Sequence, residues 1–351
     1  MLRAMPVDLT GGLPAEREFV FAEQPADPDM RESVNTWIWD EGDEVGFPRI
    51  GIEAVADQWE THDVQVNMAF SDGRVLNIFE PGKVHDPLGS DGQPRILGAG
   101  PLSFELVEPF THWRLHLDGL AIDNHVERQM AAGRPTGPAT VPVGLDVDIR
   151  SVVPPWENGA LLAEAARVLA EQEEGDLMGG PRYEQLFRMT GRLRVGDQER
   201  DVRGGGLRVR RQGVRRLPRF WGHAWQSSVF PSGRGFGYIT YPARQDGKPT
   251  YNEGYVFDGD GGLIPARVVE APWLRRMAAK GQQVPVVLET EDGRTETIHG
   301  ETLISTFSVI PVTGDFAFPV LHQAIVRYTW GGESANGMME RSSLPEHMDP
   351  Q

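Results

Sequence analysis

The sequence predicts an all-β protein of two antiparallel β-domains, each a barrel or a sandwich, joined by a short helical linker. Apolar residues alternate with polar or small ones over several short runs, which is typical of strands with one buried face. Asp- and Gly-rich turn sequences separate these runs. The 41 glycines and 27 prolines among 351 residues fit many short strands better than a parallel α/β sheet.

Four runs carry the alternation most clearly. Their apolar positions are Val64, Val66, Met68 and Phe70; Trp113, Leu115 and Leu117; Val141, Val143, Leu145, Val147 and Ile149; and Phe187, Met189, Leu193 and Val195. Hairpin turns are expected at 71–74, 196–199, 258–262 and 291–294.

One segment has a different pattern. Residues 158–175 have high helix propensity, one apolar side and a glycine after the end. We therefore predict an N-terminal β-domain over 1–150, a linker with a helix over 151–182, and a C-terminal β-domain over 183–351.

Composition disfavours several classes of protein. The 51 acidic and 34 basic residues give a formal charge of −17, which repels nucleic acid and anionic membranes. The chain has no cysteine, so disulfides and thiolate chemistry are absent. With no apolar run long enough for a signal peptide or a membrane span, we expect a cytoplasmic protein. The sequence leaves the choice between a monomer and a homodimer open.

No metal or nucleotide motif is recognisable. His112 and His116 are four residues apart, but on a strand they lie roughly 13 Å from each other, too far to share an ion. The glycine-rich stretches lack the Gly-Lys-Ser/Thr ending of a phosphate loop, and no Gly-x-Ser-x-Gly elbow is present. We expect no cofactor and no metal.

Polar residues within aromatic stripes are the candidate site. Trp221, His223 and Trp225 alternate in the stretch RFWGHAWQSSVF, so a strand would place them on one face. His322 interrupts a second stripe that begins at Phe316 and Phe318. Each stripe is also compatible with an ordinary core in which the imidazole is hydrogen-bonded to a neighbour.

A carboxylic acid lies between the two stripes in the sequence. Tyr255 and Asp258 occur in YNEGYVFDGDGG, and an acid in an apolar pocket has a raised pKa and can act as a general acid. Asp258 precedes a glycine, so it is equally compatible with a turn.

The chain resembles the AttH-type superfamily, which includes carotenoid hydratases, kievitone hydratase and lipocalin-like fungal Diels–Alderases. The resemblance rests on GHAW (222–225), GYVFDGDG (254–261) and YTWGGESANGMMERS (328–342), with looser likeness at 35–54 and 100–119. It implies two lipocalin-like barrels, hydrophobic substrates and no obligatory cofactor. It also implies catalytic roles for His223 and Asp258, although a tyrosine that lies close to the aspartate in the hydratases has no match at position 257.

These expectations combine into one leading hypothesis and two alternatives. The leading hypothesis is a cofactor-independent lyase, a hydratase/dehydratase or related isomerase/cyclase, acting on an isoprenoid- or steroid-like molecule. His223 and Asp258 would be catalytic, and the substrate would contact Trp221, Trp225, Tyr255, Phe316, Phe318 and His322. The same cavity could serve a non-catalytic lipocalin-like carrier. A carbohydrate- or protein-binding β-sandwich would instead expose its tryptophans.

Overall fold

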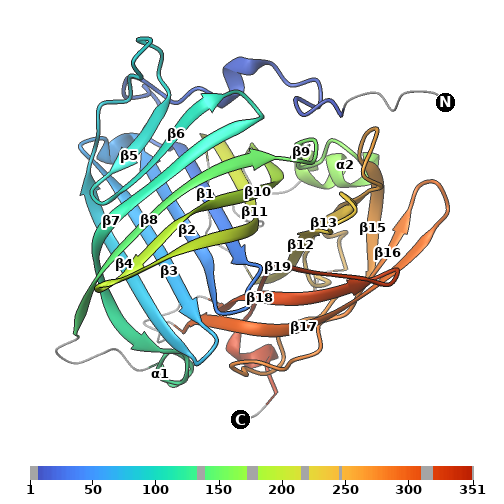
Figure 1. Cartoon of the computed structure of the whole chain (residues 1–351). Helices are drawn as coiled ribbons and strands as arrows, with labels where there is room; N and C mark the ends of the chain where they lie inside the picture. Colours follow the sequence, from blue (N-terminus) through green and yellow to red (C-terminus); the bar gives the residue numbers. More distant parts are fainter. Residues whose placement is uncertain are drawn as a thin grey trace.

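Two β-barrels lie side by side in the protein (Figure 1). The computed structural model describes residues 7–132, 139–171, 181–214, 221–244, 247–309 and 319–349. The predicted all-β class and the two lipocalin-like halves are confirmed. Each predicted hairpin turn joins two antiparallel neighbours in the sheets.

The first barrel is a large antiparallel sheet in which the pairing of β4 with β7 closes the ring β4-β3-β2-β1-β11-β10-β8-β7. Strands β5 and β6 extend the sheet beyond β7, and the short β9 pairs with β10. The strands are β1 (Met30–Asp40), β2 (Val45–Val55), β3 (Thr61–Phe70), β4 (Arg74–Lys83), β5 (Ile96–Ala99), β6 (Leu102–Glu108), β7 (His112–His125), β8 (Thr140–Ser151), β9 (Trp156–Glu157), β10 (Arg182–Val195) and β11 (Gln198–Val214).

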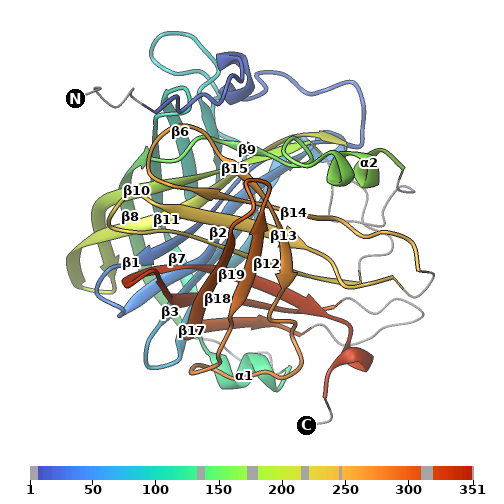
Figure 2. The same ribbon diagram turned by 90° about the vertical axis from the view of Figure 1, so that its right-hand side faces the viewer.

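The second barrel is a closed meander in which each strand pairs with the next and β12 pairs with β19. Its strands are β12 (Gly222–Val229), β13 (Gly235–Thr240), β14 (Asn252–Phe257), β15 (Ile264–Glu270), β16 (Val286–Thr290), β17 (Thr295–Ser308), β18 (Val320–Trp330) and β19 (Glu333–Ser343). Viewed from its own side, this barrel lies in front of the first (Figure 2).

The helices are short and lie outside the barrels. The linker helix α2 (Ala163–Glu171) falls within the predicted helical segment, and α1 (Val126–Met130) follows β7. In the described part of the chain there are also three 3-10 turns: η1 (Ala15–Glu18), η2 (Ala56–Gln58) and η3 (Pro345–His347). Glu253 in β14 fastens the linker, because its carboxylate accepts hydrogen bonds from the Trp156 indole and from the backbone N–H of Gly159, Leu161 and Leu162.

The strand pairing differs from the predicted division of the chain. Strands β10 and β11 follow the linker in sequence, yet they pair with β8 and β1 and belong to the first barrel. Without them, β1 and β8 would be left as two open edges. The first barrel therefore extends to Val214, and the linker helix is an insertion between two of its strands.

Three apolar clusters define the packing. One fills the first barrel and another fills the second. The third joins the barrels, because it contains Trp37 and Trp39 of β1 together with Trp225 of β12 and Ile325 of β18. Strands β1, β2 and β11 contact β19, β18 and β12 across this seam (Figure 1). The candidate stripe that includes His223 and Trp225 of β12 thus faces the other barrel.

Candidate active site

His223 lies in β12, on the face that turns toward the first barrel. Its side chain is fully buried, its Nδ1 lies 2.8 Å from Oγ of Ser342, and its Nε2 lies 3.2 Å from Oε1 of Glu340. Both partners are in β19, which pairs directly with β12, so the register places all three side chains on one face.

Glu340 is ionised in this setting. Burial acts to raise its pKa, but the hydrogen bond and charge of His223, the charge of Arg49 and a hydrogen bond from Gln323 outweigh it. The pKa of Glu340 consequently lies below its usual range. Because a carboxylate can only accept, Nε2 of His223 carries a proton toward Glu340, and Nδ1 faces the Ser342 hydroxyl.

A second buried carboxyl group approaches from the first barrel. Oε2 of Glu184, in β10, accepts a hydrogen bond of 2.9 Å from Nε1 of Trp225. Oε1 of Glu184 lies 2.7 Å from the Arg182 guanidinium. Trp225 is also the direct β12 partner of Glu340 in the sheet, so the same residue donates to one carboxyl group and pairs with the residue that carries the other.

Burial raises the pKa of Glu184 to about 7, and the negative charge of Glu340 acts in the same direction. Arg182, the Trp225 hydrogen bond and Arg211 lower the pKa in part but do not cancel the effect of burial. Glu184 can therefore hold a proton near neutral pH, whereas Glu340 does not. Such a separation of two carboxyl pKa values is what acid–base catalysis requires.

The two tryptophans of the predicted stripe share a face but differ in setting. Trp225 is buried and meets Trp37 edge-on at 4.6 Å between ring centroids, while Trp221 is half-buried against Tyr241. Neither indole is the fully exposed stacking platform of the β-sandwich alternative.

An arginine already lies over each indole. The guanidinium of Arg182 is 4.9 Å from the centroid of Trp225, and that of Arg244 is 5.5 Å from Trp221. A substrate cation placed on either ring would therefore compete with a resident guanidinium.

Asp258 is placed apart from this cluster. It follows β14 in a surface turn, its side chain is 39% exposed, and its carboxylate lies 3.2 Å from Arg294. Val229 and Phe257 both pair with Gly235, so Asp258 lies at the far end of β12, roughly 20 Å along the strand from His223. Asp258 is therefore a turn residue, as the alternative interpretation has it. Its carboxylate does not lie in an apolar pocket.

Tyr255 is buried on the seam, edge-on to Trp156 at 5.6 Å, and burial raises its pKa well above the usual value. His322 lies on the opposite face of the sheet, inside the second barrel. It stacks on Phe307 and accepts a hydrogen bond from Arg341, and burial and that charge lower its pKa. The expected cavity shared by His223 and His322 is therefore not formed. Phe316 and Phe318 lie outside the described residues.

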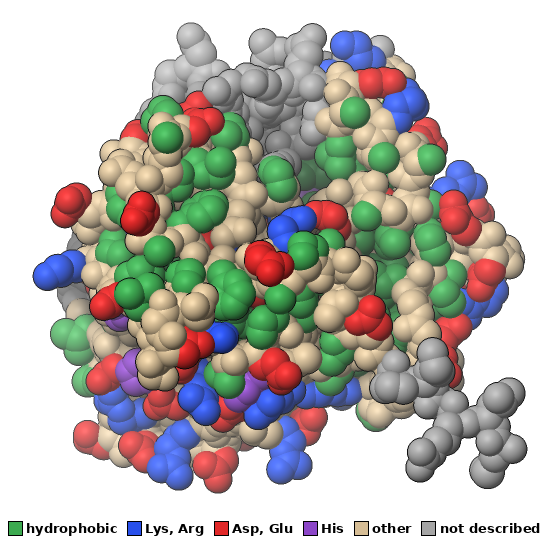
Figure 3. Space-filling model, turned by 90° about the horizontal axis from the view of Figure 1, so that it is seen from above, with side chains coloured by type: hydrophobic (Ala, Val, Ile, Leu, Met, Phe, Trp, Pro, Cys, Tyr) green, Lys and Arg blue, Asp and Glu red, His purple; other side chains and the backbone are tan. Residues whose placement is uncertain are grey.

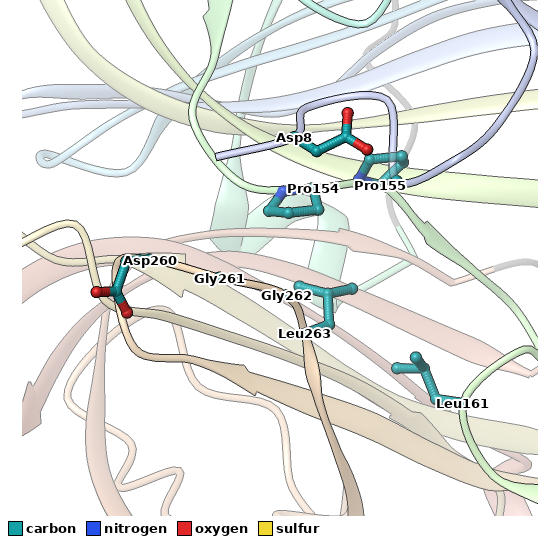
Figure 4. A pocket seen from close by; sticks show the side chains of 9 residues that line it. Asp8, Pro154, Pro155, Leu161, Asp260, Gly261, Gly262 and Leu263 are labelled. Carbon is teal, nitrogen blue, oxygen red and sulfur yellow. The ribbon is translucent and has the colours of Figure 1, made fainter. Parts of the chain in front are cut away.

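A cavity of about 630 Å³ opens between the barrels near the linker. Pro154 and Pro155 line one side of it and the turn at 260–263 lines the other (Figure 4). From above, hydrophobic side chains are spread over the middle of this face, and charged ones lie around its rim and are most numerous along the lower edge (Figure 3). The cavity's titratable groups are Asp8 and Asp260, so it is separate from the His223 cluster.

Among the residues that the structure describes, no group of three or more His, Asp or Glu side chains is placed to hold a metal ion. Within the same residues, no helix is long and apolar enough to cross a membrane.

The chain belongs to the family described as a domain of unknown function (DUF7064), which matches residues 17–345. No curated protein matches it in sequence. Among solved structures it is similar to a protein assigned as AttH from Nitrosomonas europaea, with 13% identity, a TM-score of 0.56, and 90% of this chain and 92% of that chain covered.

Two more structures share the fold. CghA, crystallised with Sch210972, has 10% identity and a TM-score of 0.54, with 90% and 88% of the two chains covered. Kievitone hydratase from Nectria haematococca has 9% identity and a TM-score of 0.51, with 95% and 94% covered. The expected similarity of fold to AttH and kievitone hydratase is confirmed.

Sequence reasoning missed the residues that surround His223. Glu184 and Arg182 come from the first barrel, and Glu340 and Ser342 come from the last strand. Arg182 and Glu184 are two residues apart, so a strand places both on one face. That spacing gives no indication that the face is buried.

Proposed function

We propose that the protein is a cofactor-independent lyase, a hydratase/dehydratase or related isomerase/cyclase, acting on an apolar isoprenoid- or steroid-like molecule at the seam between the barrels. The observation that carries the proposal is the pair of buried carboxyl groups at Trp225, one hydrogen-bonded to its indole and the other on its paired residue in β19. Glu184 has a pKa of about 7, and the pKa of Glu340 is lowered.

The roles follow from these protonation states. In hydration, protonated Glu184 gives its proton to a C=C carbon. The oxygen of water bonds to the neighbouring carbon, and its proton goes by way of the Ser342 hydroxyl to Nδ1 of His223, 2.8 Å from that hydroxyl. Glu340 orients the ring. Bulk water then takes a proton from His223 and returns one to Glu184, so the net change is the addition of one water. Dehydration runs through the same groups in reverse.

Arg182 restricts the pathway. A free carbocation beside its guanidinium would be repelled, so we expect proton transfer and water addition or loss to occur together. The aromatic residues of the seam would then bind the apolar body of the substrate and exclude water.

The structural neighbours support this class of reaction. One is named as a hydratase, and another was crystallised with a small molecule, Sch210972. Both share the two-barrel architecture.

His223→Gln is expected to lower turnover by about 10²- to 10⁴-fold, because glutamine keeps a hydrogen bond to Ser342 but cannot take a proton. The assay is incubation with a panel of terpenoid and steroid alkenes and alcohols, with mass detection of the gain or loss of one water. Asp258→Asn is the matched control and should keep full turnover. Equal activity in both variants would remove His223 from the mechanism.

The carrier alternative has a separate outcome. Lipophilic ligands that quench tryptophan fluorescence and are always recovered unaltered would identify a binding protein and exclude the lyase. The 630 Å³ cavity without a histidine is the feature that favours this alternative.

A further inference from the structure

A line of buried amide side chains connects the first barrel to the His223–Glu340 pair. Nδ2 of Asn77 donates to Oδ1 of Asn67 at 2.8 Å, and Nδ2 of Asn67 donates to Oε1 of Gln323 at 2.9 Å. Nε2 of Gln323 donates to Oε2 of Glu340 at 2.6 Å. All four side chains are at most 5% exposed. Asn77 and Asn67 belong to β4 and β3, so the line crosses the seam.

The direction of every hydrogen bond in this line is fixed by Glu340. An ionised carboxylate can only accept, so Gln323 must turn its NH₂ group toward Glu340 and its oxygen toward Asn67. Asn67 must then donate to that oxygen, and its own oxygen is left to accept from Asn77. A single orientation of the three amides satisfies the whole line.

Both oxygens of Glu340 are engaged, one by Gln323 and the other by His223. The carboxylate cannot rotate toward one partner without loosening its contact with the other. The position of the Gln323 amide is therefore linked to the geometry of the imidazole.

We propose that Asn67 and Asn77 are positioning residues for the His223–Glu340 pair, so that the first barrel sets the orientation of a base carried by the second. The effect of the two asparagines on turnover rests on the proposed function, whereas their effect on the orientation of the imidazole is independent of it. A purely structural role would stabilise the seam without any influence on His223.

The test uses Asn67→Asp in the full-length protein. The variant is isosteric, but its carboxylate cannot donate to Gln323, so the Gln323 amide must turn and withdraw its NH₂ from Glu340. In protein labelled with ¹⁵N-histidine, the ring-nitrogen shifts of His223 and their pH titration should change. Asn77→Asp, one bond further away, should cause a smaller change. Asn67→Leu repeats the test without adding a buried charge, in case the aspartate variant does not fold.

Thr36→Val is the control, because Thr36 is buried in the first barrel and donates to the Ile50 carbonyl outside the line. Folded Asn67 variants with unchanged His223 signals would overturn the positioning role. If a substrate is turned over, Asn67→Asp should lower kcat about 10-fold or more with little change in KM. Altered His223 signals in a protein with no turnover of any substrate would refute the lyase and leave this inference standing.

Discussion

Glu184→Gln is expected to lower turnover by about 10²- to 10⁴-fold, because glutamine occupies the same space without an acidic proton. In the unaltered protein, activity should fall as the pH rises through about 7, where Glu184 loses its proton. The residual activity of Glu184→Gln should not fall as the pH rises through about 7. A pH–rate profile of kcat/KM for both proteins measures the difference.

The same substitution has a consequence for stability that needs no substrate. The folded-state pKa of about 7 lies above the ordinary value of 4.5, so between these pH values the folded protein binds more protons than the unfolded chain. Stability from this group is therefore full below about pH 4.5 and is lost as the pH rises through about 7. From the low-pH to the high-pH side of that window, the unfolding free energy of Glu184→Gln should therefore rise by about 3 kcal/mol relative to that of the unaltered protein.

Urea unfolding at pH 5 and pH 8 measures this gain. Glu289→Gln is the matched control, because Glu289 is a surface residue paired with Arg267 on the outside of the second barrel. Its two unfolding curves should shift in parallel with those of the unaltered protein. If Glu184→Gln also shifts in parallel, its carboxyl group has no raised pKa and cannot be the acid.

The strands and turns of the protein could be predicted from the sequence because both signals are local. The alternation over 141–149 corresponds to β8, and the turn at 196–199 joins β10 to β11. The partners of the strands could not be predicted. The pairing of β1 with β11 joins residues such as Val34 and Arg210, which are far apart in the chain, and alternation contains no information about such partners.

The site could be predicted only in part, for a related reason. A spacing of two residues puts His223 and Trp225 on one face of the strand, as in the structure. It does not indicate which face of a strand lies inside a barrel, and for that reason the prediction puts His322 in the same cavity as His223. Nor does it show which carboxyl group becomes buried. Glu184 is buried by the surface of the other barrel, whereas Asp258 has no such cover.

The largest loss of stability is expected from Glu18→Gln. Glu18 lies in η1 and is completely buried, with a 2.9 Å ion pair to Arg208 and hydrogen bonds from Tyr183, Trp113 and the backbone N–H of Phe110. The substitution leaves the buried guanidinium of Arg208 without its counter-ion, which should cost about 3–5 kcal/mol. Urea unfolding at pH 7 measures the loss.

Glu16→Gln, in the same turn but exposed, is the control and should change stability by no more than about 0.5 kcal/mol. Burial acts to raise the pKa of Glu18, but Arg208 and the hydrogen bonds outweigh it and the pKa is lowered. Its contribution is thus present above about pH 4.5 and is lost as the pH falls through the folded-state pKa. The difference between Glu18→Gln and the unaltered protein should therefore shrink in acid. Equal losses for Glu16→Gln and Glu18→Gln would show that the pair is not a structural anchor.

This anchor and the candidate site share a strand. Tyr183 and Glu184 are adjacent in β10, so they point to opposite faces, one toward the Glu18 cluster and the other toward Trp225. Loosening η1 should therefore displace Glu184 as well as destabilise the barrel. Under conditions where Glu18→Gln is still folded, we expect turnover to fall more than in Glu16→Gln. Full turnover in the folded variant would show that β10 holds Glu184 in place without the anchor.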